Sequence, residues 1–172
     1  WNALYAPLLA TLAAAQEPVS VEQLIAWLGT SAASFEAGRL LKQSWRAFIT
    51  EREGAYALYH ASLRDFITGD VARENLSVSG GYLVDELCDR TREAHNRILE
   101  YYRKQCTGDW PKLIDDDYAR RHLAAHLAGA GRHEELFALV AHSNAWAKAR
   151  YTKEESYAEY LSDLNLAWQW AE

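Results

Sequence analysis

Apolar residues recur at helical spacing along most of this 172-residue chain. The most regular run begins after Ser20, and its apolar positions are Val21, Leu24, Ile25 and Leu28. Gln23 stands three residues after Ser20, as in a capping box, and Gly29 follows the last apolar position. The pattern therefore predicts a helix over residues 21–28. An earlier apolar stripe after Pro7 predicts another helix, and its positions are Leu8, Leu9, Leu12 and Ala13.

A third helix is predicted to begin at a cap formed by Ser31 or Ser34. It extends towards Trp45, and its expected buried positions are Phe35, Leu40 and Leu41. Three short amphipathic helices in succession can enclose a small apolar core.

After the third helix the pattern changes to that of strands. Residues 47–50 and 55–59 predict a hairpin, joined by a turn over 51–54 in which Gly54 can take a positive φ. Three helices followed by a hairpin wing make up a winged helix. We therefore predict a winged-helix domain over residues 1–76.

The rest of the chain is predicted to be helical. A polar, glycine-containing stretch over 75–81 predicts a linker. It is followed by a long helical pattern over 82–106 and by two shorter ones, 118–130 and 133–140, that predict an αα-hairpin. A last helix is expected from Glu154 onward, with a buried stripe made by Tyr157, Leu161, Leu164 and Trp168.

The predicted fold class is therefore mainly α. It combines the winged-helix domain, with its three-helix core and hairpin wing, and an all-α helical-bundle or αα-hairpin module over 82–172. The second part is rich in aromatic residues, most of which are expected in the core, with one or two meeting a neighbouring domain. These residues are Trp146, Tyr151, Tyr157, Tyr160, Trp168 and Trp170.

Charge and composition narrow the range of partners. Lys and Arg number 18 against 24 Asp and Glu, a net charge of −6, the wrong sign for binding that depends on neutralising phosphates. No run approaches the roughly 18 uncharged apolar residues of a membrane span, so we expect no membrane partner. Cys88 and Cys106 are too few for a disulfide framework, and we expect a cytoplasmic location.

A DNA-binding interpretation remains open, because many winged helices insert their third helix into the major groove. Here that helix offers Arg39, Lys42 and Arg46 as candidate DNA contacts. Glu36 lies beside them, and the predicted wing tip over 51–54 carries both signs of charge. This alternative is a transcription regulator whose helical part serves as a dimerisation or effector domain.

Two further polar groups have metal-ligand composition, and neither predicts a metal site. His122 and His126 are spaced i, i+4 but lack the Glu of an H-E-x-x-H motif and a third ligand. The three acids over 115–117 directly precede a helix, where acids serve as cap and dipole partners. We expect structural roles for both groups.

His60 is the sharpest candidate for function. It follows the second predicted strand and precedes a helix in which Ser62 is the expected cap, with a buried stripe of Leu63, Phe66 and Ile67. A histidine fixed at such a turn can donate a hydrogen bond to a phosphate group.

Two segments carry a family resemblance. Residues 58–67, LYHASLRDFI, resemble the end of the winged helix in NB-ARC and NACHT ATPases, the STAND class of nucleotide switches that includes apoptosome-forming ATPases and plant resistance proteins. Residues 118–132, YARRHLAAHLAGAGR, resemble the helical segment that follows it in apoptosome-type and bacterial WD-repeat members. The resemblance implies that His60 reaches the β-phosphate of ADP and that the helical module couples a repeat sensor to oligomerisation.

The resemblance also implies a longer parent protein. The chain has no G-x-x-x-x-G-K-[ST] loop for phosphates, so we expect neither enzyme activity nor a bound cofactor in these residues alone. It begins at Trp1 without Met, as a piece of a longer protein would. The parent is expected to be an ATPase that binds ADP or ATP with magnesium. The expected partners are its nucleotide-binding domain, its C-terminal repeat sensor and, on activation, other copies of the parent.

Overall fold

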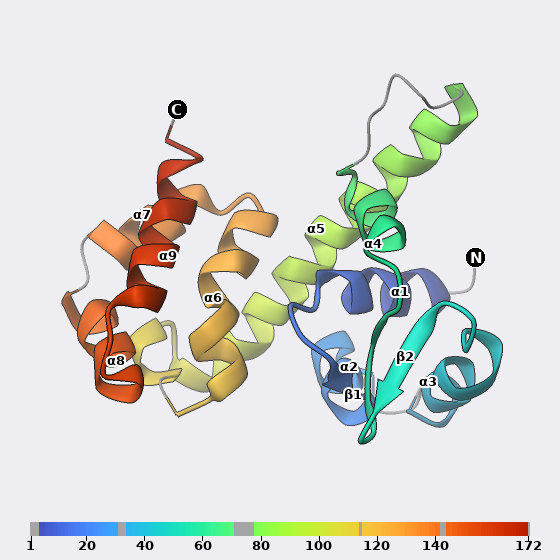
Figure 1. The fold of residues 1–172 in the computed structure, drawn as a ribbon, viewed down its shortest axis with the longest axis horizontal. Coiled ribbons are helices and arrows are strands. Elements are labelled where there is room, and N and C mark those ends of the chain that lie inside the picture. Colours follow the sequence, from blue (N-terminus) through green and yellow to red (C-terminus); the bar gives the residue numbers. More distant parts are fainter. Residues whose placement is uncertain (1–3, 31–33, 71–77, 114, 142–143, 172) are drawn as a thin grey trace. The chain divides into compact units, whose positions relative to one another are not determined.

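The computed structural model describes residues 4–30, 34–70, 78–113, 115–141 and 144–171. These residues are mainly helical, as predicted, and include a small antiparallel sheet of three strands (Figure 1). The chain divides into two compact units, residues 1–97 and 98–172. The division falls within helix α5 (Val78–Cys106), which contributes residues to both units. The domain bounds 1–76 and 82–172 stay a prediction.

Each unit has its own set of elements. The first unit contains, besides the start of α5, α1 (Tyr5–Ala14), β1 (Val19–Ser20), α2 (Val21–Leu28), α3 (Ser34–Arg39), a π-helical turn (Leu40–Ser44), β2 (Ile49–Arg52), β3 (Ala55–Leu58) and α4 (Ala61–Thr68). The second contains, besides the end of α5, a 3-10 helix (Trp110–Leu113), α6 (Asp117–Gly129), α7 (His133–Ala141), α8 (Asn144–Glu154) and α9 (Ala158–Trp168). Among the described residues, no helix combines the length and apolar character needed to cross a membrane.

Helix α2 begins and ends where the sequence predicts. The Ser20 hydroxyl oxygen accepts a hydrogen bond from the backbone N–H of Gln23 at 3.1 Å, which satisfies one free amide of the first turn. Gly29 ends the helix in the left-handed conformation, with φ of 69°. The predicted stripe of α1 is confirmed as well, since Leu8 and Leu12 are buried.

The third helix differs from the prediction in one buried position. Leu40 and Leu41 are buried, but Phe35 is 86% exposed. Ala37 faces inward together with the two leucines. Phe35 lies two positions before Ala37, and residues two apart on a helix do not share a face. The helix then widens, because the N–H of Trp45 bonds to the Leu40 carbonyl five residues earlier. A cap at Ser31 lies outside the described residues.

The hairpin turn is tighter than predicted. Glu53 and Gly54 alone connect β2 to β3, with φ of 54° and 80°, the positive values that a two-residue turn matched to strand twist requires. Strand β2 therefore continues to Arg52. Strand β3 lies in the middle of the sheet and also pairs with β1, where Val19 stands opposite Tyr56. Two residues are too few to produce an alternating pattern, so the sequence did not predict β1.

Helices α4 and α5 complete the apolar core of the first unit. The side chain of Ile67 is buried in a cluster with Ala13 and Leu87. The Thr91 hydroxyl is also buried, and it lies within hydrogen-bond distance of two carbonyl oxygens, those of Ile67 at 3.2 Å and Leu87 at 2.9 Å. Helix α5 begins at Val78, so the glycine pair at 80–81 is helical and not part of a linker. The rest of the predicted linker, up to residue 77, lies outside the described residues.

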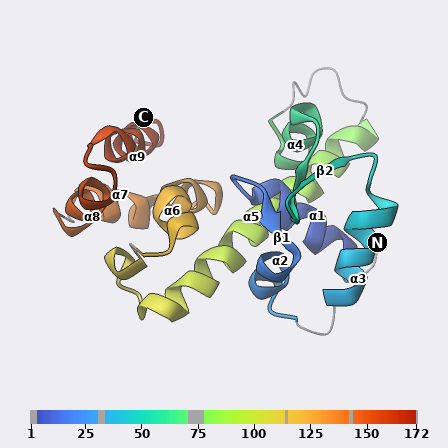
Figure 2. The same ribbon diagram turned by 60° about the horizontal axis from the view of Figure 1, so that its bottom comes forward.

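The second unit contains the predicted αα-hairpin. Helices α6 and α7 pack together through buried leucines and are joined by a turn in which Gly131 has φ of 72°. Asp116 caps α6, because its Oδ1 accepts a hydrogen bond from the Ala119 N–H at 2.8 Å. The capping role predicted for these acids is thus confirmed for Asp116. Helix α9 packs on α6, α7 and α8 (Figure 2).

The predicted face of the last helix is wrong. Tyr157, Leu161 and Trp168 are 53%, 59% and 68% exposed, and the buried residues of α9 are Asp163 and Ala167. The inward face of α9 carries Asp163, which binds the buried Arg150 of α8, and most of the apolar stripe faces outward. Of the aromatic residues expected in the core, Trp146 is fully buried, whereas four are exposed: Tyr151, Tyr157, Trp168 and Trp170.

Candidate functional site

The junction between β3 and α4 holds His60 in a defined backbone position. His60 is the N-cap residue of α4, with extended backbone angles, and its carbonyl accepts hydrogen bonds from the N–H groups of Leu63 at 3.1 Å and Arg64 at 3.3 Å. On the other side, the Tyr59 N–H donates to the Phe48 carbonyl at 2.8 Å and continues the hairpin pairing by one residue. Both sides of the junction are therefore anchored by backbone hydrogen bonds.

The junction corrects one sequence prediction and confirms another. Ser62 was the expected cap of this helix, but it lies inside the first turn because His60 occupies the cap position. The His60 side chain makes no capping hydrogen bond. The apolar stripe is as predicted: Ile67 is buried, and Leu63 and Phe66 pack partly buried against it.

The imidazole of His60 is exposed and lies against another exposed ring. The rings of Tyr59 and His60 meet edge to face, with centroids 4.4 Å apart. Tyr59 is 61% exposed and Phe48, its backbone partner, is 55% exposed. Next to them an apolar hollow of about 220 Å³ is lined by Leu9, Trp45, Phe48, Ile49, Leu58 and Leu63. The hollow is thus lined by Leu58 and Leu63, which flank His60 in the sequence, and not by His60 itself.

The basic residues of the DNA-binding alternative lie elsewhere on the same unit. Arg39 ends α3 and is exposed. Lys42 and Arg46 line a larger hollow of about 590 Å³ together with Glu51 and Tyr56. Burial, followed by the nearby Glu51 carboxylate, raises the pKa of the Tyr56 hydroxyl. The hollow is therefore lined by two cationic side chains, one carboxylate and one phenol group.

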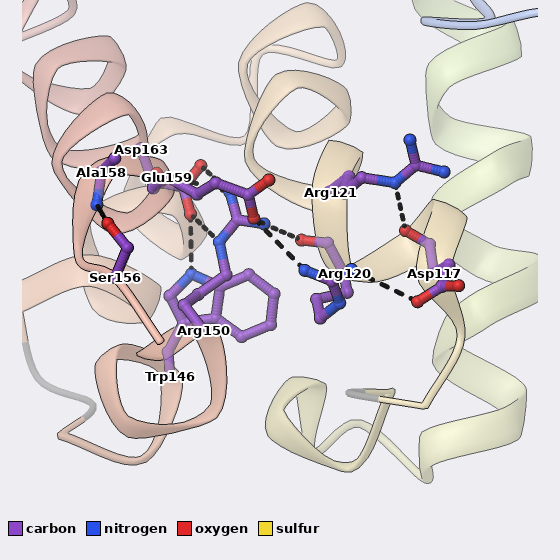
Figure 3. Close-up of polar contacts among 9 residues, drawn as sticks. All are labelled: Asp117, Arg120, Arg121, Trp146, Arg150, Ser156, Ala158, Glu159 and Asp163. Atoms are coloured by element: carbon purple, nitrogen blue, oxygen red, sulfur yellow. Dashed lines mark hydrogen bonds and ion pairs between the residues drawn. The ribbon is translucent and has the colours of Figure 1, made fainter. Parts of the chain in front are cut away.

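The second unit contains a buried ionic cluster that the sequence did not predict (Figure 3). Arg150 donates from Nε and Nη2 to the two carboxylate oxygens of Asp163, each at 3.1 Å. Its Nη1 donates to Glu159 Oε2 at 2.6 Å and to the Arg120 carbonyl at 2.8 Å. The Trp146 indole N–H also donates to Asp163, at 2.9 Å. One guanidinium therefore links α6, α8 and α9.

Most charges of this cluster are removed from water, and the Glu159 side chain is 33% exposed. Arg150 is 2% exposed, and Arg120 and Asp163 are 5% exposed. Burial raises the pKa of the Asp163 carboxyl, while Arg150 and the Trp146 indole act in the opposite direction. The geometry is that of a structural tie, because the N–H donors of Arg150 find their acceptors within the chain.

The two candidate metal-binding histidines of α6 lie beside Tyr118. The Tyr118 hydroxyl and His126 Nε2 are 3.0 Å apart, and His126 is buried. The His122 ring meets Tyr118 edge to face, with centroids 4.9 Å apart. Within the described part of the chain, no three His, Cys, Asp or Glu side chains come together in a way that could hold a metal ion.

Comparisons with protein-family models, with curated proteins and with solved structures give no match for this chain.

Proposed function

We propose that this chain is a regulatory part of a signal-transduction NTPase of the STAND class. In this proposal its first part is a winged helix that clamps the ADP-bound, closed state of the parent protein. His60 donates a hydrogen bond to the β-phosphate of ADP, which a separate nucleotide-binding domain holds together with magnesium. The helical module couples a C-terminal repeat sensor to oligomerisation of the parent.

The observation that carries the proposal is the position of His60. Its backbone is fixed between β3 and α4, its imidazole is exposed, and Leu58 and Leu63, which flank it in the sequence, line an apolar hollow. A small ring on a fixed turn can reach a phosphate without ordering a long side chain, and the apolar surface suits contact with another domain. The nucleotide is proposed as the partner because residues 58–67 resemble the end of the STAND winged helix.

The order of elements supports the winged-helix part of the proposal. Helix, strand, two helices and two strands follow one another in residues 5–58, and the first strand pairs with the last. A winged helix needs this arrangement, because the short first strand ties the wing hairpin to the helices. No nucleotide-binding loop occurs in the chain, so the proposed contact requires the parent.

The experiment replaces His60 with alanine in the parent protein and measures the rate at which bound ADP is released. A hydrogen bond to a charged phosphate contributes about 1.5–3 kcal/mol, so we expect release to be ~10- to 100-fold faster in His60→Ala. Ser62→Ala, an exposed polar position two residues further along, is the matched control and should release ADP like the unmodified protein. Unchanged release from His60→Ala would show that His60 does not contact the nucleotide.

A further inference from the structure

The hollow of about 590 Å³ in the first unit, which we call the charged hollow, is lined by opposite charges from two different elements. Its cations are Lys42, in the π-helical turn, and Arg46, which follows that turn. Its carboxylate is that of Glu51, in β2. All three charged residues are exposed, so a ligand can reach them from solution.

The sheet determines where the acidic group of the charged hollow lies. Glu51 and Tyr56 stand directly opposite each other in the pairing of β2 with β3, so their side chains share one face of the sheet. Ile49 lies two positions before Glu51 and is on the same face. Tyr56 is 2% exposed. Burial, followed by the Glu51 carboxylate, raises the pKa of the Tyr56 hydroxyl, so this phenol stays protonated beside the carboxylate.

The two cations of the charged hollow are not neutralised by close contacts. Among the described residues, the side chains of Lys42 and Arg46 form neither a hydrogen bond nor an ion pair, and Glu51 binds neither of them. Lys42 acts on the Glu22 carboxyl, but the lowered pKa of that group comes mainly from its backbone N–H and the Ser20 hydroxyl. Opposite charges that line one hollow without meeting suit a ligand that carries both signs.

The number of charges indicates the class of ligand. Two cations can each bind a carboxylate, and one carboxylate can accept hydrogen bonds from an ammonium group. Acidic amino acids carry this set of groups. Leu41 and Ile49 also line the hollow and provide apolar surface for the methylene groups between the charges. We propose that the charged hollow binds an acidic amino acid, with its carboxylates at Lys42 and Arg46 and its ammonium group at Glu51.

Ligands that carry phosphate alone fit the charged hollow less well. The Glu51 carboxylate lies in the same hollow as the two cations and repels a phosphate group that binds to them. The phosphates of duplex DNA meet the same carboxylate, in a chain with a net charge of −6. An acidic amino acid is instead attracted by Glu51, because its ammonium group is positive. The proposal does not rest on the nucleotide role of His60, which does not line this hollow.

The test titrates the complete 172-residue chain with L-glutamate and L-aspartate and follows amide chemical shifts by NMR. Because exposed ion pairs are weak, we expect a Kd of the order of 1 mM. L-glutamine lacks one carboxylate, and glutarate lacks the ammonium group. Each of these two compounds should therefore bind ~5-fold more weakly than L-glutamate, and inorganic phosphate should bind more weakly as well.

Substitutions assign the individual contacts. Arg46→Gln and Glu51→Gln should each weaken L-glutamate binding ~5-fold. Glu51→Gln should also abolish the preference for L-glutamate over glutarate, because it removes the partner of the ammonium group. Arg52→Gln is the matched control, since Arg52 is an exposed residue of the same strand whose side chain lies on the opposite face from Glu51. It should bind L-glutamate like the unmodified chain.

Three results would overturn the proposal. They are the absence of L-glutamate and L-aspartate binding up to ~50 mM, equal binding of glutarate and L-glutamate, and an equal loss of binding in Arg52→Gln. Binding of inorganic phosphate or duplex DNA through Lys42 and Arg46, in place of L-glutamate, would assign the cations to phosphate groups and would overturn it as well. Far-UV circular dichroism verifies that each variant is folded.

Discussion

The two units stabilise their helices by different means. In the first unit the core is apolar, with Leu8, Leu12 and Leu24 fully buried, and the buried Thr91 hydroxyl bonds to backbone carbonyls. In the second unit the apolar core is supplemented by Arg150, whose partners come from α6 and α9. An apolar core loses stability in steps with each methylene group that is removed, whereas removal of one partner from a buried ionic cluster leaves a whole charge uncompensated.

The largest expected effect is at Arg150. Replacing it with alanine leaves the Asp163 carboxylate buried without its main counter-charge, so we expect the free energy of unfolding to fall by about 3–5 kcal/mol. Urea unfolding followed by circular dichroism measures the change. Arg121→Ala, at an exposed arginine of α6 whose Nε donates to the Asp117 carbonyl, should change the free energy by less than about 0.5 kcal/mol. Equal effects of the two substitutions would mean that the cluster contributes no special stability.

An effect of intermediate size is expected in the first unit, at His95. Burial, with a smaller contribution from the Arg64 guanidinium, lowers the pKa of His95 to about 4. The unfolded chain therefore binds this proton more tightly, so stability is full above the ordinary histidine pKa and falls as the pH drops below it. Between pH 7 and pH 5 we expect a loss of about 2 kcal/mol in the free energy of unfolding.

A variant separates this contribution from those of the other titrating groups. His95→Gln removes the titration, so its stability should fall less steeply between pH 7 and pH 5 than that of the unmodified chain. Urea unfolding at the two pH values measures both slopes. Parallel slopes would show that His95 does not stay neutral in the folded state.

The smallest effects are expected at the helix caps, one in each unit. Ser20→Ala and Asp116→Ala each remove the acceptor of a first-turn N–H, and each should cost about 1 kcal/mol. The two sites share no contacts, so the double variant should lose about the sum, roughly 2 kcal/mol. Thermal unfolding of the three variants measures this. A double variant that departs clearly from the sum would show that the two caps do not contribute independently to one unfolding transition.

The local elements of the first unit were predictable because short-range chemistry determines them. Ser20, Gln23 and Gly29 define α2 through a cap, a hydrogen bond and a positive φ, all within ten residues. The exposure of Phe35 was not predictable, since it follows from which side of α3 meets the rest of the unit. Strand β1 was missed because its two residues carry no alternating pattern and its partner β3 lies more than 30 residues away in the sequence.

The candidate site was predicted in position but not in detail. The sequence places His60 at a strand-to-helix turn. The structure adds that it is itself the cap residue and that its sequence neighbours Leu58 and Leu63 line an apolar hollow. The roles of His60 and of the basic residues stay predictions. The ionic cluster was missed because Arg150 and Asp163 look like ordinary surface residues, and the signal lay in the acids that share the inward face of α9.

The cluster around Arg150 also bears on which sequence changes this unit can accept. A single replacement of Arg150 leaves the buried Asp163 carboxylate without its counter-charge, and a replacement of Asp163 leaves the buried Arg150 with the partly exposed Glu159 alone, so both are unfavourable. A simultaneous exchange of Arg150, Asp163, Glu159 and Arg120 for apolar residues of similar volume would leave no such charge. The cluster can thus be replaced as a set but not one residue at a time. A sequence with the ion pairs and a sequence with apolar residues are therefore separated by intermediates of lower stability.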